Sequence, residues 1–242
     1  MKNLSLRRAA CSLVLFFAGA TMALAGSFQV NPVRAELSRA RPVSAMTVRN
    51  TGAEPAVIQL RAVSWTQPDG KDRYDMAPDI LGTPPIFTIP AGGSQLIRVG
   101  SRRPPEANLE RAYRLFLQEV PPPPQPGSKG LRLALRLSIP LFVIPATAVS
   151  PELHWDAVAV ASGKVRIHVA NHGSSHAWFT QIGLVMVQGG QALPISTLPV
   201  YVLPGAAHDW IVDVDTSTDH TLRLTAQGEV GTIQTDLTIP AR

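Results

Sequence analysis

The chain has 242 residues, a length that suits one large domain or two domains of modest size. It holds 22 Lys and Arg against 17 Asp and Glu, together with a single cysteine, Cys11. One cysteine excludes a framework of disulfide bonds within the chain and a zinc site built from several thiolates.

The first 25 residues have the pattern of a secretory signal peptide. Basic residues precede an apolar run over residues 9–20, and residues 23–25 supply a small-x-small cleavage site. The run is too short to span a membrane, so we expect a protein that is not membrane-embedded. Cleavage removes Cys11 and three of the 22 basic residues, which leaves 19 basic against 17 acidic residues. A nearly neutral chain without a thiol excludes cysteine nucleophiles and argues against nucleic-acid binding.

Short runs of alternating apolar and polar residues fill the rest of the chain, and Pro, Gly, Asn and Asp interrupt them. A period of two is typical of half-buried strands, so the sequence predicts an all-β fold. The proline-bracketed segment 144–151 predicts a linker between two sandwiches of about 100 residues each. We expect domains over residues 26–146 and 147–242. The expected strands are 28–37, 44–50, 56–66, 94–99, 113–120, 131–143, 157–161, 164–170, 178–187, 200–203, 209–214, 221–227 and 232–239.

The segment 121–130 is rich in proline and glycine and separates two of the most regular strands. It offers no apolar side chains to bury and no continuous set of backbone donors, so the sequence predicts a long loop. Adjacent strands rarely need so long a connection. This loop therefore indicates a role beyond closing a turn.

Leucines alternate with other residues directly after this loop, so one face of the strand is an aliphatic ridge. The ordinary interpretation is a strand packed inside its own sandwich. The preceding loop and Pro140 favour instead an edge strand whose first part extends past its own sheet. A long apolar edge invites pairing with another chain. The leucines of this ridge are Leu131, Leu133, Leu135 and Leu137.

Five stretches, in this order after a signal peptide, resemble the N-terminal domain of periplasmic pilus chaperones, the PapD-like family. The stretches are residues 33–37, 83–87, 89–99, 113–122 and 131–135. The resemblance covers the first half of the chain well and the second half only in length and β-pattern. The surroundings of Pro140 are similar to the branch of the family called archaic.

The resemblance implies two immunoglobulin-like β-sandwich domains in a boomerang arrangement and a chaperone that is not an enzyme and needs no cofactor. Such chaperones bind pilus subunits that lack their last strand, insert a strand of their own into the gap, and deliver the subunits to an outer-membrane usher. The donor residues implied are Leu131, Leu133 and Leu135, with Leu137 as a fourth. Whether the free chaperone covers this strand by self-association stays open.

The family holds the C-terminal carboxylate of the subunit with an Arg on the first strand and a Lys on the donor strand. The Arg corresponds to Arg34, whereas Pro140 occupies the Lys position. We expect Arg114 to supply the second cation, because it lies on the adjacent strand opposite the face of Tyr113, Leu115 and Leu117. A guanidinium binds a carboxylate through two hydrogen bonds. Glu110 matches the acidic member of the family's interdomain ion pair, but Ile144 occupies the position of its basic partner.

Two other classes of function remain open at this point. A pilus or adhesin subunit would need an alternating extension at its mature N-terminus, and Phe28, Val30 and Pro32 form a poor one. A metal-binding protein would use the histidines, all of which lie in the second half. His172 and His176 would need a third ligand, and turn or surface histidines are the simpler interpretation.

Overall fold

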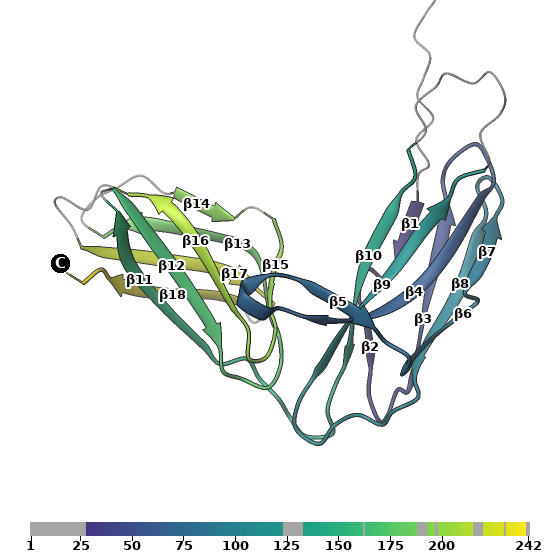
Figure 1. Ribbon diagram of the computed structural model, residues 1–242, viewed down its shortest axis with the longest axis horizontal. Helices are drawn as coiled ribbons and strands as arrows, with labels where there is room; N and C mark the ends of the chain where they lie inside the picture. Colours follow the sequence, from purple (N-terminus) through teal and green to yellow (C-terminus); the bar gives the residue numbers. More distant parts are fainter. Residues whose placement is uncertain are drawn as a thin grey trace, which may run out of the picture.

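The structure, a computed structural model, describes residues 28–122, 133–161, 163–187, 193–196, 198–214, 220–229 and 231–240. The predicted signal peptide and Leu131 of the predicted ridge lie outside the described residues. The described strands form two groups, one before and one after the segment 144–152, set at an angle to each other (Figure 1). Among the described residues, no helix has the length and apolar character needed to cross a membrane.

The first group consists of two facing sheets. Buried residues such as Met46, Ile97, Leu115 and Leu141 fill the space between them, as the alternating pattern requires. One sheet has the order β1 (Phe28–Asn31), β3 (Val43–Asn50), β8 (Ser94–Ser101) and β6 (Ile80–Thr83). The other has the order β2 (Ala35–Leu37), β10 (Arg136–Val143), β9 (Arg111–Val120), β4 (Ala56–Thr66) and β5 (Arg73–Met76), and β7 (Ile86–Ile89) also pairs with β4.

The second group is also a pair of sheets around its own core, which includes Ile167, Phe179 and Leu224. The predicted all-β fold with two sandwiches is therefore confirmed. One sheet has the order β11 (Leu153–Ala161), β12 (Lys164–Asn171) and β16 (Ala207–Asp213). The other has the order β14 (Leu193–Ser196), β13 (Ala177–Met186), β17 (Thr221–Gly228) and β18 (Gly231–Thr238), and β15 (Val200–Val202) also pairs with β13.

The single strand expected over residues 28–37 is two strands in the structure. β1 pairs with β3 in one sheet, whereas β2 runs parallel to β10 in the other. Pro32 lies between them and has no N–H with which to continue a ladder. The change of sheet brings Arg34, the residue before β2, to the edge of the sheet that contains β10.

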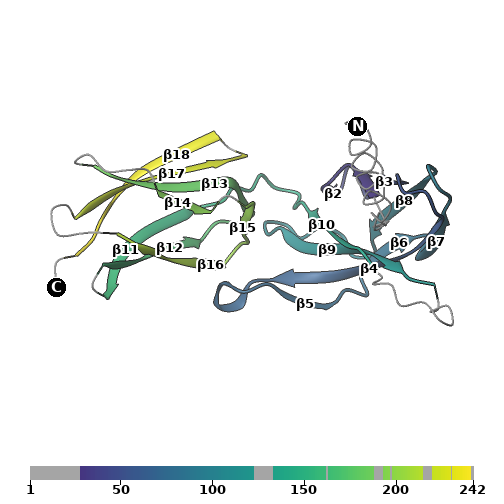
Figure 2. The same ribbon diagram turned by 90° about the horizontal axis from the view of Figure 1, so that it is seen from above.

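The two groups are in direct contact. The hairpin of β4 and β5 reaches from the first group toward β15 and β16 of the second (Figure 2). At its tip, the short 3-10 turn η1 (Pro68–Gly70) approaches β16 so closely that a Cβ on Gly70 would lie 3.0 Å from the Ala207 carbonyl oxygen. Gly70 also has a φ of +71°, which favours glycine. Trp65 and Phe142 of the first group are buried in the core of the second.

Candidate functional site

Arg34, Pro140 and Arg114 lie in one row across the sheet that faces the second group of strands. Pro140 on β10 pairs with Arg114 on β9, and Leu141 pairs with Ala35, the residue after Arg34. Directly opposite residues project from the same face of a sheet. The two cations that the sequence predicts are thus brought to the same level on neighbouring strands, with buried Pro140 between them.

Arg114 is a half-buried cation held between two aromatic rings. Its guanidinium carbon lies 3.7 Å from the centre of the Trp65 ring and 5.3 Å from that of Tyr201. Its Nε is buried without a hydrogen-bond partner, and no ion pair in the described part of the chain includes it. Burial lowers the pKa of Arg114, although it stays a cation. The site therefore holds a positive charge without a contacting carboxylate.

The carboxylate of Asp72, near Arg114, is engaged by other groups. It accepts hydrogen bonds from Trp65 Nε1 at 2.8 Å, from Gln67 Nε2 at 3.0 Å and from the Tyr74 hydroxyl at 2.8 Å. Burial disfavours the Asp72 anion, but these hydrogen bonds lower its pKa below its usual value. Asp72 therefore fixes the Trp65 ring under Arg114 and does not pair with the cation itself.

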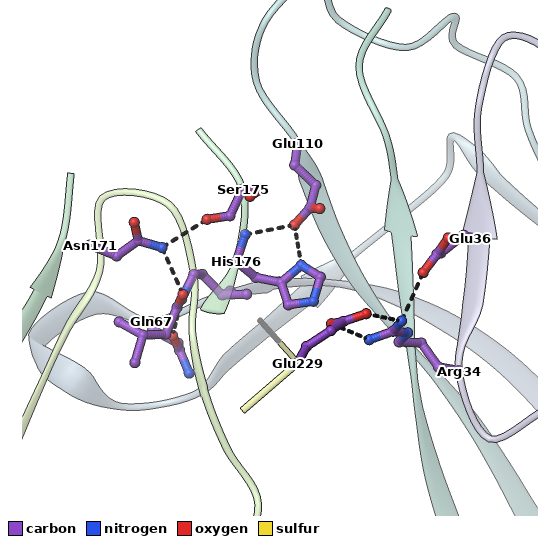
Figure 3. A network of polar contacts seen from close by, with 10 residues as sticks. Arg34, Glu36, Gln67, Glu110, Asn171, Ser175, His176 and Glu229 are labelled. Atoms are coloured by element: carbon purple, nitrogen blue, oxygen red, sulfur yellow. Dashed lines mark hydrogen bonds and ion pairs between the residues drawn. The ribbon is translucent and has the colours of Figure 1, made fainter. Parts of the chain in front are cut away.

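Arg34 forms a two-pronged ion pair with Glu229, which lies at the turn between β17 and β18 in the second group of strands (Figure 3). Nη1 of Arg34 donates to Glu229 Oε2 at 2.7 Å, and Nη2 donates to Oε1 at 2.6 Å. Glu36 lies 3.2 Å from the same Nη2. The hydrogen bonds with Glu229 raise the pKa of Arg34, and those from Arg34 lower the pKa of Glu229. Unlike Arg114, Arg34 is thus already neutralised.

Glu110 contacts the second group through His176, which the sequence assigned to a turn or a metal site. Glu110 Oε1 accepts a hydrogen bond from the backbone N–H of His176 at 3.1 Å and lies 2.7 Å from its Nδ1 (Figure 3). The imidazole stacks on Phe142, with ring centres 3.7 Å apart. Both side chains are at least nine-tenths buried. His176 therefore provides the interdomain partner that Ile144 at the expected position does not.

The other histidines do not form the alternative metal site within the described residues. No three His, Cys, Asp or Glu side chains in that part of the chain are grouped closely enough to bind an ion. His172 packs edge-on against His154, and His208 stacks on Trp210.

Trp65 and Tyr201 form an aromatic clamp around Arg114, and Gln67 links this clamp to the second group of strands. Its Nε2 donates to the Tyr201 carbonyl oxygen at 3.0 Å, and its Oε1 accepts from the Leu203 N–H at 2.9 Å. The clamp thus combines Trp65 from the first group with Tyr201 from the second. Its geometry depends on how the two groups of strands dock.

The predicted leucine ridge passes from core to solvent as β10 begins. Leu137 packs partly buried against the first core, and Leu135 is half-buried just before the strand. Leu133 is 60% exposed. Within the described strands, β2 covers β10 only at Leu141–Val143, so residues 136–140 form an open edge on that side. An exposed apolar residue therefore precedes a strand segment that pairs with β9 on one edge and has no described partner strand on the other.

A family model described as "Pili and flagellar-assembly chaperone, PapD N-terminal domain" matches residues 27–148. No curated protein is similar enough in sequence to give a significant match.

Solved structures of such chaperones share the fold. A chain of the CsuC–CsuE complex, a chaperone–tip adhesion subunit pre-assembly complex from archaic chaperone-usher Csu pili of Acinetobacter baumannii, superimposes with a TM-score of 0.66. It is 22% identical, with 89% of this chain and 100% of that chain covered. The Salmonella enterica SafA pilin–SafB chaperone complex gives 0.59 at 18% identity, covering 86% and 95%. The CupB2 chaperone of Pseudomonas aeruginosa gives 0.58 at 17% identity, covering 88% and 100%.

The family model spans half of the chain, including both predicted cations and the ridge. The two sandwiches, the order of the five matching stretches and the fold of the solved chaperones agree with it. The chain belongs to the PapD-like family of pilus-assembly chaperones.

Proposed function

We propose that this chaperone binds pilus subunits by adding their open sheet to the free edge of β10. The observation that carries the proposal is the unpaired edge over residues 136–140, which begins three residues after exposed Leu133. Unpaired backbone groups give a partner strand its hydrogen bonds, and alternate side chains give it pockets to fill. The side chains that would fill these pockets are Leu131, Leu133, Leu135 and Leu137. Leu137 also packs against the core of the chaperone's first domain.

Arg34 and Arg114 bind the C-terminal carboxylate of the subunit in this proposal. Both lie in the row at which the open edge ends, so a strand added along β10 brings its end toward them. Arg114 is the stronger candidate for first contact, because its charge has no carboxylate partner among the described ion pairs. Charge-assisted hydrogen bonds to a carboxylate are roughly twice as strong as neutral ones.

The remaining parts of the proposal follow from the family and the sequence. Residues 1–25 direct the chain to the periplasm, and domains over 26–146 and 147–242 form the mature chaperone. Bound subunits pass to an outer-membrane usher. In the free chaperone, the same edge of β10 is available to a second copy of the chain, which would cover the ridge by self-association.

Capture of subunits from the periplasm tests the proposal. The tagged chain is expressed with pilus subunit genes from its own genomic neighbourhood, and the bound proteins are identified by mass spectrometry. Leu133→Arg places a charge on the ridge and should abolish capture while leaving the circular dichroism spectrum unchanged.

Leu81→Arg is the matched control, because Leu81 is 45% exposed on β6, in the sheet of the first domain that does not contain β10. That variant should capture subunits as the unaltered chain does. Undiminished capture by Leu133→Arg would exclude the ridge as the subunit-binding strand.

A further inference from the structure

Glu229 occupies the edge of the Arg34 guanidinium that its two terminal nitrogens form, one of the edges through which arginine binds a carboxylate. Its two oxygens accept from both terminal nitrogens of the guanidinium, at 2.7 and 2.6 Å. Arginine binds a free carboxylate through the same paired geometry. Glu229 is therefore an intramolecular copy of the group that Arg34 is proposed to bind.

The charges around the two cations differ. Arg34 faces Glu229 and also Glu36, whose Oε1 lies 3.2 Å from Nη2. Two carboxylates thus surround one guanidinium. Arg114, in contrast, rests on Trp65 and Tyr201 and belongs to none of the described ion pairs.

We propose that Glu229 is a specificity-determining competitor at the carboxylate site of this chaperone, an inference that rests on the proposed role of Arg34. A carboxylate that arrives alone at the edge of the two terminal nitrogens has to displace Glu229 and is repelled by it. A carboxylate at the end of a strand paired along β10 gains the contacts of that strand as well and replaces Glu229. The competitor thereby lowers the affinity of the site for small free acids, whereas the end of a complementary strand offsets the same cost with the contacts of its strand.

The exposure of the pair allows this exchange. The side chains of Arg34 and Glu229 are 27% and 47% exposed, so water reaches both as they separate. Exposed ion pairs contribute little net free energy. The largest contributions of such pairs, about 1 kcal/mol, correspond to about a fivefold change in binding constant. We expect an effect of up to this size when the competitor is removed.

Glu229→Gln removes the competing charge and keeps the side-chain volume, and acetate is the probe. Acetate is titrated at constant ionic strength into the full mature chain while the Arg34 Nε–H signal is followed by nuclear magnetic resonance. The apparent Kd for acetate at Arg34 should fall about two- to fivefold in Glu229→Gln. Addition of Arg34→Ala to this variant should abolish the gain.

Asp236→Asn is the matched control. Asp236 pairs with Arg223 through two hydrogen bonds of 2.8 and 3.0 Å on the same β17–β18 hairpin, and its loss removes the same charge. This control should bind acetate as the unaltered chain does. Equal or weaker acetate binding by Glu229→Gln, including no detectable binding in either protein, would overturn the inference. The subunit capture experiment with Leu133→Arg reports on the proposed function independently.

Discussion

Pro140 on β10 and Arg114 on β9 are cross-strand partners, so their side chains leave the same face of the sheet at the same level. A lysine at position 140, as the family resemblance implies, would stand beside the Arg114 guanidinium. In this chain the proline fills that place, and the neighbouring strand carries the cation. The row that contains Arg34 thus keeps a second positive charge despite the change at position 140.

Arg114→Gln should weaken subunit binding about ten- to hundredfold, because hydrogen bonds to a charged group contribute about 1.5–3 kcal/mol. Arg114→Lys should bind the subunit with an affinity between those of Arg114→Gln and the unaltered chain. It keeps the charge but loses the planar group that stacks on Trp65. Titration of purified subunit measured by surface plasmon resonance gives the affinities.

Arg166→Gln is the control for Arg114, because Arg166 on β12 also has a buried Nε without a hydrogen-bond partner. Its replacement should leave subunit affinity unchanged. Equal losses in the Arg114 and Arg166 variants would indicate a general effect of charge and not a binding site.

Leu137→Ala should lower the free energy of unfolding by about 1–2 kcal/mol, because Leu137 packs partly buried against the first core. Leu133→Ala should change it by less than about 0.5 kcal/mol, since that side chain is largely in solvent. Urea unfolding followed by circular dichroism measures both. A larger loss in Leu133→Ala would show that the free chain already buries the exposed end of the ridge.

Glu110→Ala and His176→Ala should each destabilise the docking of the two domains, by about 1–3 kcal/mol, because each leaves a buried polar group without its partner. A double-mutant cycle should give a clear coupling energy. The exposed pair of Glu152 and His154 in the second domain, 3.5 Å apart, provides the matched cycle. Its coupling should be below about 0.5 kcal/mol, and equal coupling in the two cycles would contradict the role of the buried pair.

All three tyrosines of the chain should ionise above the ordinary pH of 10 while the protein is folded. Burial and the hydrogen bond to Asp72 raise the pKa of Tyr74 to about 12. Burial, with a hydrogen bond to Asp79, raises the pKa of Tyr113, and burial raises that of Tyr201. Absorbance at 295 nm during an alkaline titration measures the ionisation.

The same shifts fix the sign of the pH dependence of stability. A phenol with a raised pKa in the folded state stays protonated there after its unfolded counterpart has ionised. The stabilisation is complete below pH 10 and is lost as the pH rises through the folded pKa values. The free energy of unfolding should therefore decrease with rising pH above 10, and a tyrosine that titrates normally in the folded protein would contradict this.

The alternating pattern of the sequence was sufficient to predict the long strands. β4 has the predicted bounds, 56–66, because its buried apolar residues recur at every second position, with a single shift of phase between Leu60 and Val63. The short strands β5, β6, β7 and β14 were missed, since four residues carry too little periodicity to stand out. The division of 28–37 was also missed, because the local pattern does not show which sheet a strand joins.

The sequence predicted the site residues of the first domain but not their partners in the second domain. Arg34 and Arg114 were found through motifs of the first domain, and the structure places them in one row. Glu229 and His176 were not predicted as partners of Arg34 and Glu110. Glu229 lies 195 residues from Arg34 in sequence, and His176 lies 66 residues from Glu110. Contacts between separate sandwiches depend on how these dock, which strand periodicity does not record.

The short strand β2 limits the length of any strand that can be added to the open edge of β10. Because β2 occupies the edge of β10 from Leu141 onward, a strand added in line with it has to stop where β2 begins. The start of β2 thus limits how far an added strand can extend along β10, and Arg34 lies at this limit. In the proposed mode of binding, a partner whose last strand is one residue too long would meet the backbone of β2 and not the guanidinium, so the position of the chain terminus would matter as well as its charge.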